Sequence, residues 1–340
     1  MTSRHAIDRY AHLDHDDFAR PAKRSRPRTK DRPDYSQAAA GRVITVDRGR
    51  YRCQLLESGT MVTATKARRL GRKSVIVGDL VHIVGELSDA AGTLVRIVAV
   101  EPRRTVLRRT SDDINATERP VVANADQLMI VTALADPSPR PGMIDRLLVA
   151  AYDAGIEPLL CLTKADLASP NELTAWFAPL GLPIVVTRPD SSLEAVHGLL
   201  IGHVTALVGH SGVGKSTLIN RLVPGAGRST GEVNEVTGRG RHTSTSAVAL
   251  RLPDDDGWVI DTPGIRGFGL SHVADDTVLA AFHDLAEFTL ACPRGCRHLL
   301  EETECGLTAA AASGALSESR LASFRRIIGA VGATRAGPAR

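Results

Sequence analysis

The pattern of apolar and polar residues changes three times along the chain. Residues 1–38 show no apolar periodicity. Between residues 41 and 100, short apolar runs are separated by glycines, which is typical of β-strands joined by turns. From residue 120 onwards, buried-type runs alternate with helical spacing. This alternation predicts a parallel sheet covered by helices on both faces.

The β-rich segment is predicted to form a small barrel. Its strands are expected at Arg42–Val46, Tyr51–Leu56, Met61–Lys66, Leu80–Val84 and Leu94–Val100. Five short strands favour an OB-fold, which commonly binds oligonucleotides, although strand number alone leaves other small barrels open. The segment is basic, which suits RNA or a solvated face, through Arg48, Arg50, Arg52, Lys66, Arg68, Arg69, Arg72 and Lys73.

The α/β segment is predicted to alternate strands and helices regularly. Strands are expected at Gln127–Ala133, Pro158–Leu162, Pro183–Thr187, His203–Val208 and Trp258–Ile260. Helices are expected at Met143–Ala154, Asn171–Phe177, Ser192–Leu200 and Thr217–Leu222, and a basic helix at Ser317–Val331.

One stretch between a predicted strand and a helix matches the phosphate-loop pattern G-x-x-x-x-G-K-[ST]. It consists of Gly209, His210, Ser211, Gly212, Val213, Gly214, Lys215, Ser216 and Thr217. Such a loop points backbone N–H groups at a polyphosphate, while Lys215 reaches the β and γ phosphates and Ser216 ligates Mg²⁺. Because the strand and helix are both predicted, a nucleoside triphosphate site is favoured over a plain glycine-rich turn.

A second motif follows the predicted strand Pro158–Leu162. Thr163, Lys164, Ala165 and Asp166 fit [NT]-K-x-D, the segment with which guanine-nucleotide proteins read the base. The Asp166 carboxylate would accept hydrogen bonds from guanine N1–H and the 2-amino group, which adenine lacks on that edge. The sequence therefore predicts GTP rather than ATP.

The third motif, D-x-x-G, runs from Asp261 to Gly264 after the predicted strand Trp258–Ile260. Asp261 would hold Mg²⁺ through water, and the Gly264 N–H would meet the γ-phosphate. A hydroxyl-rich loop lies upstream, with His242 followed by Thr243, Ser244 and Thr245. It suits the loop whose hydroxyl ligates Mg²⁺ in the triphosphate state, and the choice among these three hydroxyls stays open.

The order of these motifs differs from that of ordinary GTPases, in which the base-reading segment comes last. Here Thr163–Asp166 precedes the phosphate loop and Asp261–Gly264. The sheet can be the same if the chain is circularly permuted, with the usual termini joined between residues 187 and 203. Permutation leaves the D-x-x-G loop leading directly into the C-terminal region.

Clustered cysteines and basic residues predict a metal site and a basic tail. Three of the five cysteines crowd together, and Cys292, Cys296, His298 and Cys305 match a structural zinc site in a reducing compartment. Cys53 and Cys161 are predicted as core thiols. The net charge is only +4, but residues 20–32 are strongly basic, which suits a solvated tail or an RNA-binding arm. The sequence shows no signal peptide or membrane span, which favours the cytoplasm.

Taken together, the motifs and their order resemble the circularly permuted, ribosome small-subunit-dependent GTPases of the RsgA type. The resemblance implies an α/β, circularly permuted P-loop GTPase domain with an N-terminal all-β OB-fold barrel and a C-terminal helical zinc-binding domain. The expected boundaries are a disordered basic tail at 1–38, the RNA-binding barrel at 39–102, a linker at 103–119, the GTPase domain at 120–271 and the zinc domain at 272–335.

The resemblance also implies late maturation of the small ribosomal subunit by a monomer that binds GTP or GDP, Mg²⁺, one Zn²⁺ and ribosomal RNA, with hydrolysis stimulated by the subunit. Ile265 stands where Ras-like enzymes carry a water-orienting glutamine, so slow intrinsic hydrolysis is expected and His242 is the candidate to position the water. The rival hypotheses are a nucleotide-dependent kinase and an RNA-binding module with a vestigial nucleotide site.

Overall fold

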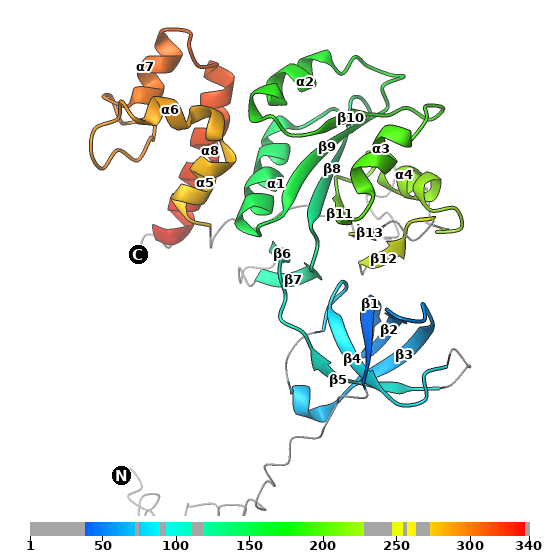
Figure 1. Cartoon of the computed structure of the whole chain (residues 1–340). Helices are drawn as coiled ribbons and strands as arrows, with labels where there is room; N and C mark the ends of the chain where they lie inside the picture. The colour runs from blue at the N-terminus through cyan, green and yellow to red at the C-terminus, as the bar shows by residue number, and fades with distance from the viewer. Residues whose placement is uncertain are drawn as a thin grey trace, which may run out of the picture. The chain divides into compact units, whose positions relative to one another are not determined.

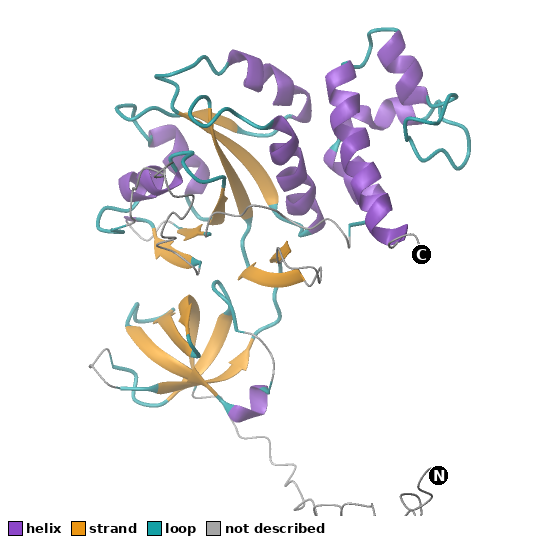
Figure 2. Ribbon diagram, turned by 180° about the vertical axis from the view of Figure 1, so that it is seen from behind, coloured by secondary structure: helices purple, strands orange, loops and turns teal. Residues whose placement is uncertain are grey.

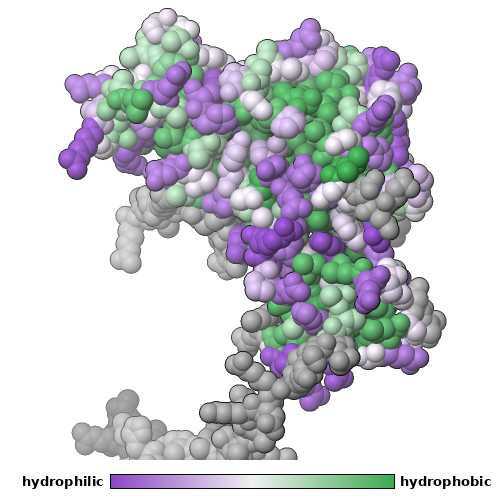
Figure 3. Space-filling model, viewed as in Figure 1, coloured by the Kyte–Doolittle hydropathy of each residue, from purple (hydrophilic) through white to green (hydrophobic). Residues whose placement is uncertain are grey.

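The computed structural model describes residues 38–71, 75–88, 93–110, 118–227, 247–253, 257–262 and 273–336. They belong to a compact unit, Gln37–Arg340, which is distinct from Met1–Ser36 (Figure 1). The predicted basic tail lies outside the described residues. On the face drawn in Figure 3, apolar residues are interspersed with hydrophilic ones. None of the helices that the structure describes has the length and apolar character needed to cross a bilayer.

The N-terminal strands form the predicted barrel. They are β1 (Ala39–Asp47), β2 (Arg50–Leu55), β3 (Met61–Lys66), β4 (Leu80–Val84) and β5 (Val95–Val100), with a short 3₁₀ turn at Arg68–Leu70. β1 pairs with both β2 and β4, and β5 pairs with β3 and β4, so the sheet closes on itself. Alternate residues such as Val43, Cys53 and Ile83 fill the interior, because neighbouring side chains along a strand point to opposite faces.

The second part is the predicted α/β sheet. Its strands are β8 (Gln127–Ala133), β9 (Glu157–Thr163), β10 (Ile184–Val186), β11 (Val204–Val208), β12 (Val248–Arg251) and β13 (Trp258–Asp261). They lie in the order β10-β9-β8-β11-β13-β12, and every neighbouring pair is parallel except β12 and β13. The predicted strands and the parallel sheet are confirmed, whereas β12 had not been predicted.

Helices cover both faces of this sheet (Figure 2). α1 (Pro141–Asp153) and α2 (Asn171–Phe177), followed by a 3₁₀ turn at Ala178–Leu180, pack with Leu128 and Ile130 of β8. α3 (Glu194–Leu200) and α4 (Lys215–Leu222) pack with Met129 and Val131 of the same strand. β8 is buried along its whole length, as its continuous apolar run predicted.

The barrel and the α/β sheet share one continuous sheet of eleven strands, because β1 also pairs with β12 at Thr45 and Val248. The intervening segment forms a hairpin of β6 (Val106–Thr110) and β7 (Glu118–Ala123). Next to it, the buried carboxylate of Asp79 accepts hydrogen bonds from the Arg103 guanidinium at 2.7 and 2.9 Å. No local sequence pattern indicated these connections between distant parts of the chain.

The C-terminal part is helical. It contains α5 (Asp275–Ala281), a 3₁₀ turn at His283–Leu285, α6 (Ala286–Thr289), α7 (Gly306–Ala312) and α8 (Glu318–Ala336). The helix predicted at Ser317–Val331 is therefore confirmed and extends further. The core of this part includes Phe282 and Phe324, whose rings meet edge to face at 5.4 Å between centroids.

A buried ion network joins this helical part to α1. Arg320 donates to Asp145 of α1 at 3.0 Å and to Asp284 at 2.9 and 3.2 Å, and its guanidinium lies 4.1 Å from the centre of the Phe282 ring. Both carboxylates and Arg320 are almost fully buried. Their contacts with each other offset only part of the cost of removing three charges from water, since burial still raises the pKa of Asp145 above its ordinary value.

We expect Arg320→Ala to destabilise the protein by about 3–5 kcal/mol, because it leaves two buried carboxylates without their guanidinium. Arg326→Ala is the matched control on the same helix, since the Arg326 side chain is 57% exposed and lies 3.7 Å from Asp145. Its cost should stay below about 1 kcal/mol. Urea unfolding followed by circular dichroism measures the free energy of unfolding of both variants. Equal losses of stability would show that the buried network contributes no more than the exposed Arg326.

Candidate nucleotide site and metal cluster

The phosphate loop connects β11 to α4, and its glycines are required by the backbone. A Cβ on Gly209 would lie 2.5 Å from the carbonyl oxygen of Val131 in β8. Gly212 and Gly214 have φ values of +83° and +89°, a region that side chains disfavour. The loop is thus held tightly against the sheet at the N-terminus of α4, where backbone N–H groups favour anions.

The predicted base-reading segment contacts this loop directly. The Thr163 hydroxyl, at the end of β9, lies 2.6 Å from the carbonyl oxygen of Val213 and donates to it. Ala165 follows, and its N–H donates to the Thr187 carbonyl at 3.2 Å. Asp166 is exposed, so its side chain is open to a ligand. The structure therefore brings the two motifs together although the sequence separates them.

Lys164 has an unexpected partner. Its ammonium donates to the backbone carbonyl of Asp136, and its Nζ lies 3.9 Å from the Asp136 carboxylate. Asp136 lies in the loop between β8 and α1, and the next residue, Pro137, lies against Gly212 of the phosphate loop. Asp136 was not among the residues predicted for the site. The Asp-Pro dipeptide marks a turn there, but no local signal connects that turn to Lys164.

Lys215 and Asp261 meet at the same edge of the sheet. The Lys215 ammonium donates to the Asp261 carboxylate and, at 2.5 Å, to the Thr262 carbonyl. Asp261 is buried at the end of β13, and Thr262 is anchored by its hydroxyl to the Leu207 carbonyl at 2.6 Å. Ser216 follows Lys215 in the first turn of α4 and is half-buried.

The rest of the phosphate loop is more open to solvent. Ser211 and Thr217 are exposed, and His210 Nδ1 lies 3.1 Å from the Ser211 carbonyl. The predicted hydroxyl loop with His242, Thr243, Ser244 and Thr245 lies outside the described residues, as do Gly264 and Ile265.

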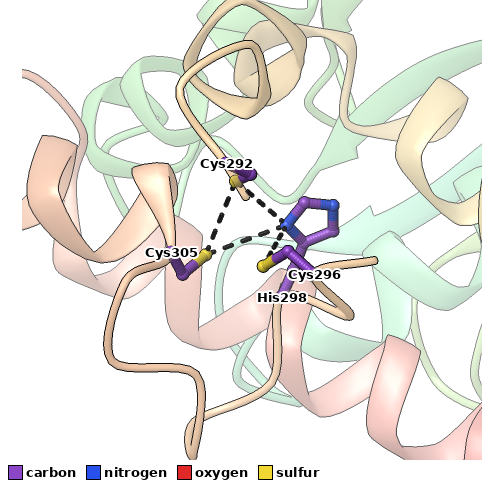
Figure 4. Close-up of side chains that lie close together, drawn as sticks. All are labelled: Cys292, Cys296, His298 and Cys305. Carbon is purple, nitrogen blue, oxygen red and sulfur yellow. Dashed lines mark hydrogen bonds between the residues drawn. The ribbon is translucent and has the colours of Figure 1, made fainter. Parts of the chain in front are cut away.

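The C-terminal cysteines and His298 form a tight cluster (Figure 4). The ligand atoms of Cys292, Cys296, His298 and Cys305 all lie within 4.8 Å of one another. Cys292 and Cys305 sulfurs are 3.9 Å apart, and His298 Nδ1 lies 3.5, 3.6 and 3.8 Å from the sulfurs of Cys292, Cys296 and Cys305. Tetrahedral zinc, with bonds of ~2.3 Å to sulfur and ~2.0 Å to nitrogen, requires separations of about 3.8 and 3.5 Å.

Surrounding groups support this cluster. The Gly306 N–H donates to the Cys292 sulfur at 3.2 Å, and Arg325 donates to the His298 carbonyl at 3.1 Å. Burial raises the pKa of the Cys305 thiol, but hydrogen bonds from His298 and nearby backbone N–H groups outweigh it and bring that pKa to about 6. Burial and the neighbouring Cys305 raise the pKa of Cys296 to about 11. Zinc binds thiolates, so the ion would displace the proton of Cys296 on binding. The donor set, its spacing and its outer contacts therefore fit a structural zinc ion.

The two remaining cysteines are placed as predicted in the cores. Cys53 and Cys161 are both fully buried, and burial raises the pKa of each thiol to about 12. They are consequently protonated and unreactive near neutral pH.

We expect Gly209→Ala to abolish tight nucleotide binding, because the new methyl group would press on the Val131 carbonyl and displace the loop. Gly198→Ala is the control: a Cβ at Gly198 in α3 has no atom within 4 Å, and alanine favours helices. Fluorescent-nucleotide titration should show at least a tenfold loss only for Gly209→Ala, which corresponds to about 1.4 kcal/mol. Similar affinities for the two variants would contradict the proposed tight fit.

Comparison with known proteins agrees with this geometry. The model of the RsgA GTPase family matches residues 100–271. A protein named small ribosomal subunit biogenesis GTPase RsgA from Pseudomonas aeruginosa is 41% identical over 241 residues, covering 68% of this chain and 70% of the relative. Its namesake from Alcanivorax borkumensis is 39% identical over 264 residues, covering 75% and 73%.

Two solved structures share the fold. The crystal structure of YjeQ from Thermotoga maritima aligns with a TM-score of 0.64 and 26% identity over 86% of this chain and 98% of that one. The structure of YloQ, titled a circularly permuted GTPase, gives a TM-score of 0.66 at 22% identity over 91% and 99%, a likeness of fold alone. With its motifs in the permuted order, its barrel and its Cys/His cluster, the chain belongs to the RsgA GTPase family.

Proposed function

We propose that this GTPase acts in late maturation of the small ribosomal subunit. In this proposal it is a cytoplasmic monomer that binds the subunit and its ribosomal RNA in the GTP state and releases them after hydrolysis to GDP and phosphate. The observation that carries the proposal is the hydrogen bond from Thr163 to Val213, which links the predicted guanine-reading segment to the phosphate loop. The relatives' names supply the subunit.

The nucleotide site is assigned residue by residue. Asp166 accepts hydrogen bonds from the guanine edge, while Lys164, held by Asp136, lies along the base. Lys215 binds the β and γ phosphates, and its contacts with Asp261 and Thr262, next to the phosphate loop, support this assignment. Ser216 and Asp261 would hold Mg²⁺, which neutralises charge on the phosphate oxygens when bound.

Hydrolysis is proposed to depend on the partner. The position after Gly264 is Ile265, whose side chain has no group to orient a water molecule. We assign that role to His242 when the subunit is bound. Thr243, Ser244 and Thr245 supply the candidate hydroxyl for Mg²⁺ in the GTP state. This arrangement keeps turnover slow until the correct partner is bound.

The N-terminal barrel is assigned to RNA binding, and the C-terminal helical part is assigned to holding a structural zinc ion. The barrel, at about 39–102, provides an RNA-binding surface. Residues 272–335 form a domain whose Cys292, Cys296, His298 and Cys305 hold one zinc ion. The four ligand atoms support this assignment because their spacing matches tetrahedral coordination. Zinc would then stabilise a segment in which Leu290 and Leu300 are 88% and 78% exposed and contribute little to a core.

Phosphate release with and without small subunits tests the function. We expect slow GTP turnover alone and strong stimulation by subunits. Asp166→Asn should shift this stimulated turnover from GTP to xanthosine triphosphate, because the amide N–H can donate to the 2-oxo group that xanthine carries. A shift in base preference ties the activity to this chain and excludes a contaminating GTPase.

In the same assay, His242→Ala should keep GTP-dependent subunit binding and lose stimulation, whereas Lys215→Ala should lose both. Subunits that bind equally well with GDP and a non-hydrolysable GTP analogue would refute the switch, since coupling requires a difference in affinity, commonly about 5–150-fold. Stimulated turnover by His242→Ala at the wild-type rate would remove His242 from the mechanism.

For the metal, we expect one zinc ion per chain by elemental analysis, and its loss in Cys305→Ser. After chelation, a thiol reagent should modify the three cluster cysteines of the native protein but reach all five cysteines only in denaturant, because the pKa values of Cys53 and Cys161 are raised to about 12. Cys53→Ala is the control that should retain zinc. A protein with no zinc, or with five reactive thiols while folded, would contradict this assignment.

A further inference from the structure

Arginine and threonine side chains stand in register across one outward face of the barrel. Arg50 of β2 lies opposite Thr65 of β3, and Thr65 lies opposite Arg96 of β5. In the adjacent row, Arg52 lies opposite Thr63. Directly opposed residues of neighbouring strands project from the same face of a sheet. We call Arg50, Arg52, Thr63, Thr65 and Arg96 the outer face.

The burial pattern confirms which way this face points. Along β2, exposed Arg50 and Arg52 alternate with buried Tyr51 and Cys53. Arg96 is exposed between two buried neighbours of β5, and both threonines are half-buried. The arginines are therefore presented to solvent, two strand spacings apart across β3, which is roughly 10 Å.

The charge of this face favours a polyanion. The acid in register with it is Asp47, which lies opposite Arg50 at the β1–β2 hairpin. Exposed Arg48 lies at the tip of the same hairpin, so arginine outnumbers acid along this edge. Arginine guanidinium groups match phosphate oxygens in shape and charge.

The barrel lacks exposed aromatic rings on which unpaired bases could stack. Tyr51 is the one Phe, Trp or Tyr between residues 38 and 100, and it is 7% exposed with its ring in the core. His82 is outward on β4, but it pairs with Glu101 at 3.2 Å. Barrels that bind single strands stack successive bases on exposed aromatic rings. This barrel has no such platform to offer.

We infer that the outer face of the barrel docks on double-helical RNA through its phosphates and 2′-hydroxyls. The inference deepens the proposed function, on which its choice of RNA rests. The arginines contact phosphates, and the hydroxyls of Thr63 and Thr65 between them are placed to bond ribose 2′-hydroxyls. A duplex presents both groups in its wide minor groove without requiring base stacking, and its A-form shape rather than its sequence is recognised.

Fluorescence anisotropy with the full chain tests the inference. The probes are an RNA duplex of about 16 base pairs, one of its strands alone and the DNA duplex of the same sequence. We expect the RNA duplex to bind most tightly. Arg50→Gln with Arg96→Gln should weaken duplex binding roughly tenfold and lower the slope of log affinity against log salt by about 2, one per lost phosphate contact.

Matched variants separate charge from position. Arg119→Gln with Arg146→Gln removes the same charge from exposed arginines of β7 and α1 and should leave duplex binding within about twofold of wild type. Thr63→Val with Thr65→Val should reduce the preference for RNA over DNA, since valine cannot bond a 2′-hydroxyl. Tighter binding of the single strand, or equal losses in both arginine pairs, would overturn the inference.

Loss of duplex binding can be distinguished from loss of the proposed GTPase function. Arg50→Gln with Arg96→Gln should retain the wild-type rate of GTP turnover without subunits, because the outer face contains none of the nucleotide residues. Loss of that basal turnover would contradict an independent RNA-docking face. Duplex binding is measured without ribosomes, so it can succeed or fail whether or not subunits stimulate hydrolysis.

Discussion

The parallel pairing of β11 with β8 and β13 is the constraint on which the nucleotide site depends. β11 carries the phosphate loop, and its register places Leu207 opposite both Met129 of β8 and Asp261 of β13. β8 in turn pairs in parallel with β9, which ends at Thr163. Parallel strands end at the same edge of a sheet, so three motifs that are remote in the sequence converge. Circular permutation changes the connections between these strands but not their hydrogen-bonded neighbours.

Hydrogen bonds between the motifs then hold their side chains in fixed positions relative to one another. Thr163 bonds the phosphate loop, Lys164 bonds the loop before α1, and Lys215 bonds both Asp261 and Thr262. Each contact joins two segments that are remote in the sequence. The Thr163 and Lys215 contacts are buried or partly buried, whereas the Lys164 contact is exposed. Hydrogen bonds of this kind fix side chains that would otherwise sample many rotamers. The residues proposed to bind the base, the phosphates and the metal therefore lie together at one preorganised edge of the α/β sheet.

The barrel and the helical part each attach to an element that flanks a nucleotide motif. β1 of the barrel pairs with β12, whose first residue, Val248, follows the segment containing His242 by only a few positions. Arg320 of the helical part binds Asp145 of α1, the helix that follows the Asp136 loop and its Lys164 contact. These attachments are a β-pairing and a buried ion network, not flexible linkers. The barrel and the helical part are thus each attached to structure that adjoins a nucleotide motif.

Local pattern alone determined much of this protein. The strand Gln127–Ala133 and the helix Asn171–Phe177 have the bounds that apolar spacing predicted, and the spacing of Gly209, Lys215 and Ser216 identified a phosphate loop, because short-range sterics and periodicity encode such elements. The four zinc-ligand candidates also followed from spacing. Tertiary structure alone decided the β1–β12 pairing, the Asp136–Lys164 contact and the Arg320 network. These join residues 28 to more than 200 positions apart, and chain closure over such distances depends on the packing of the whole fold rather than on any local pattern.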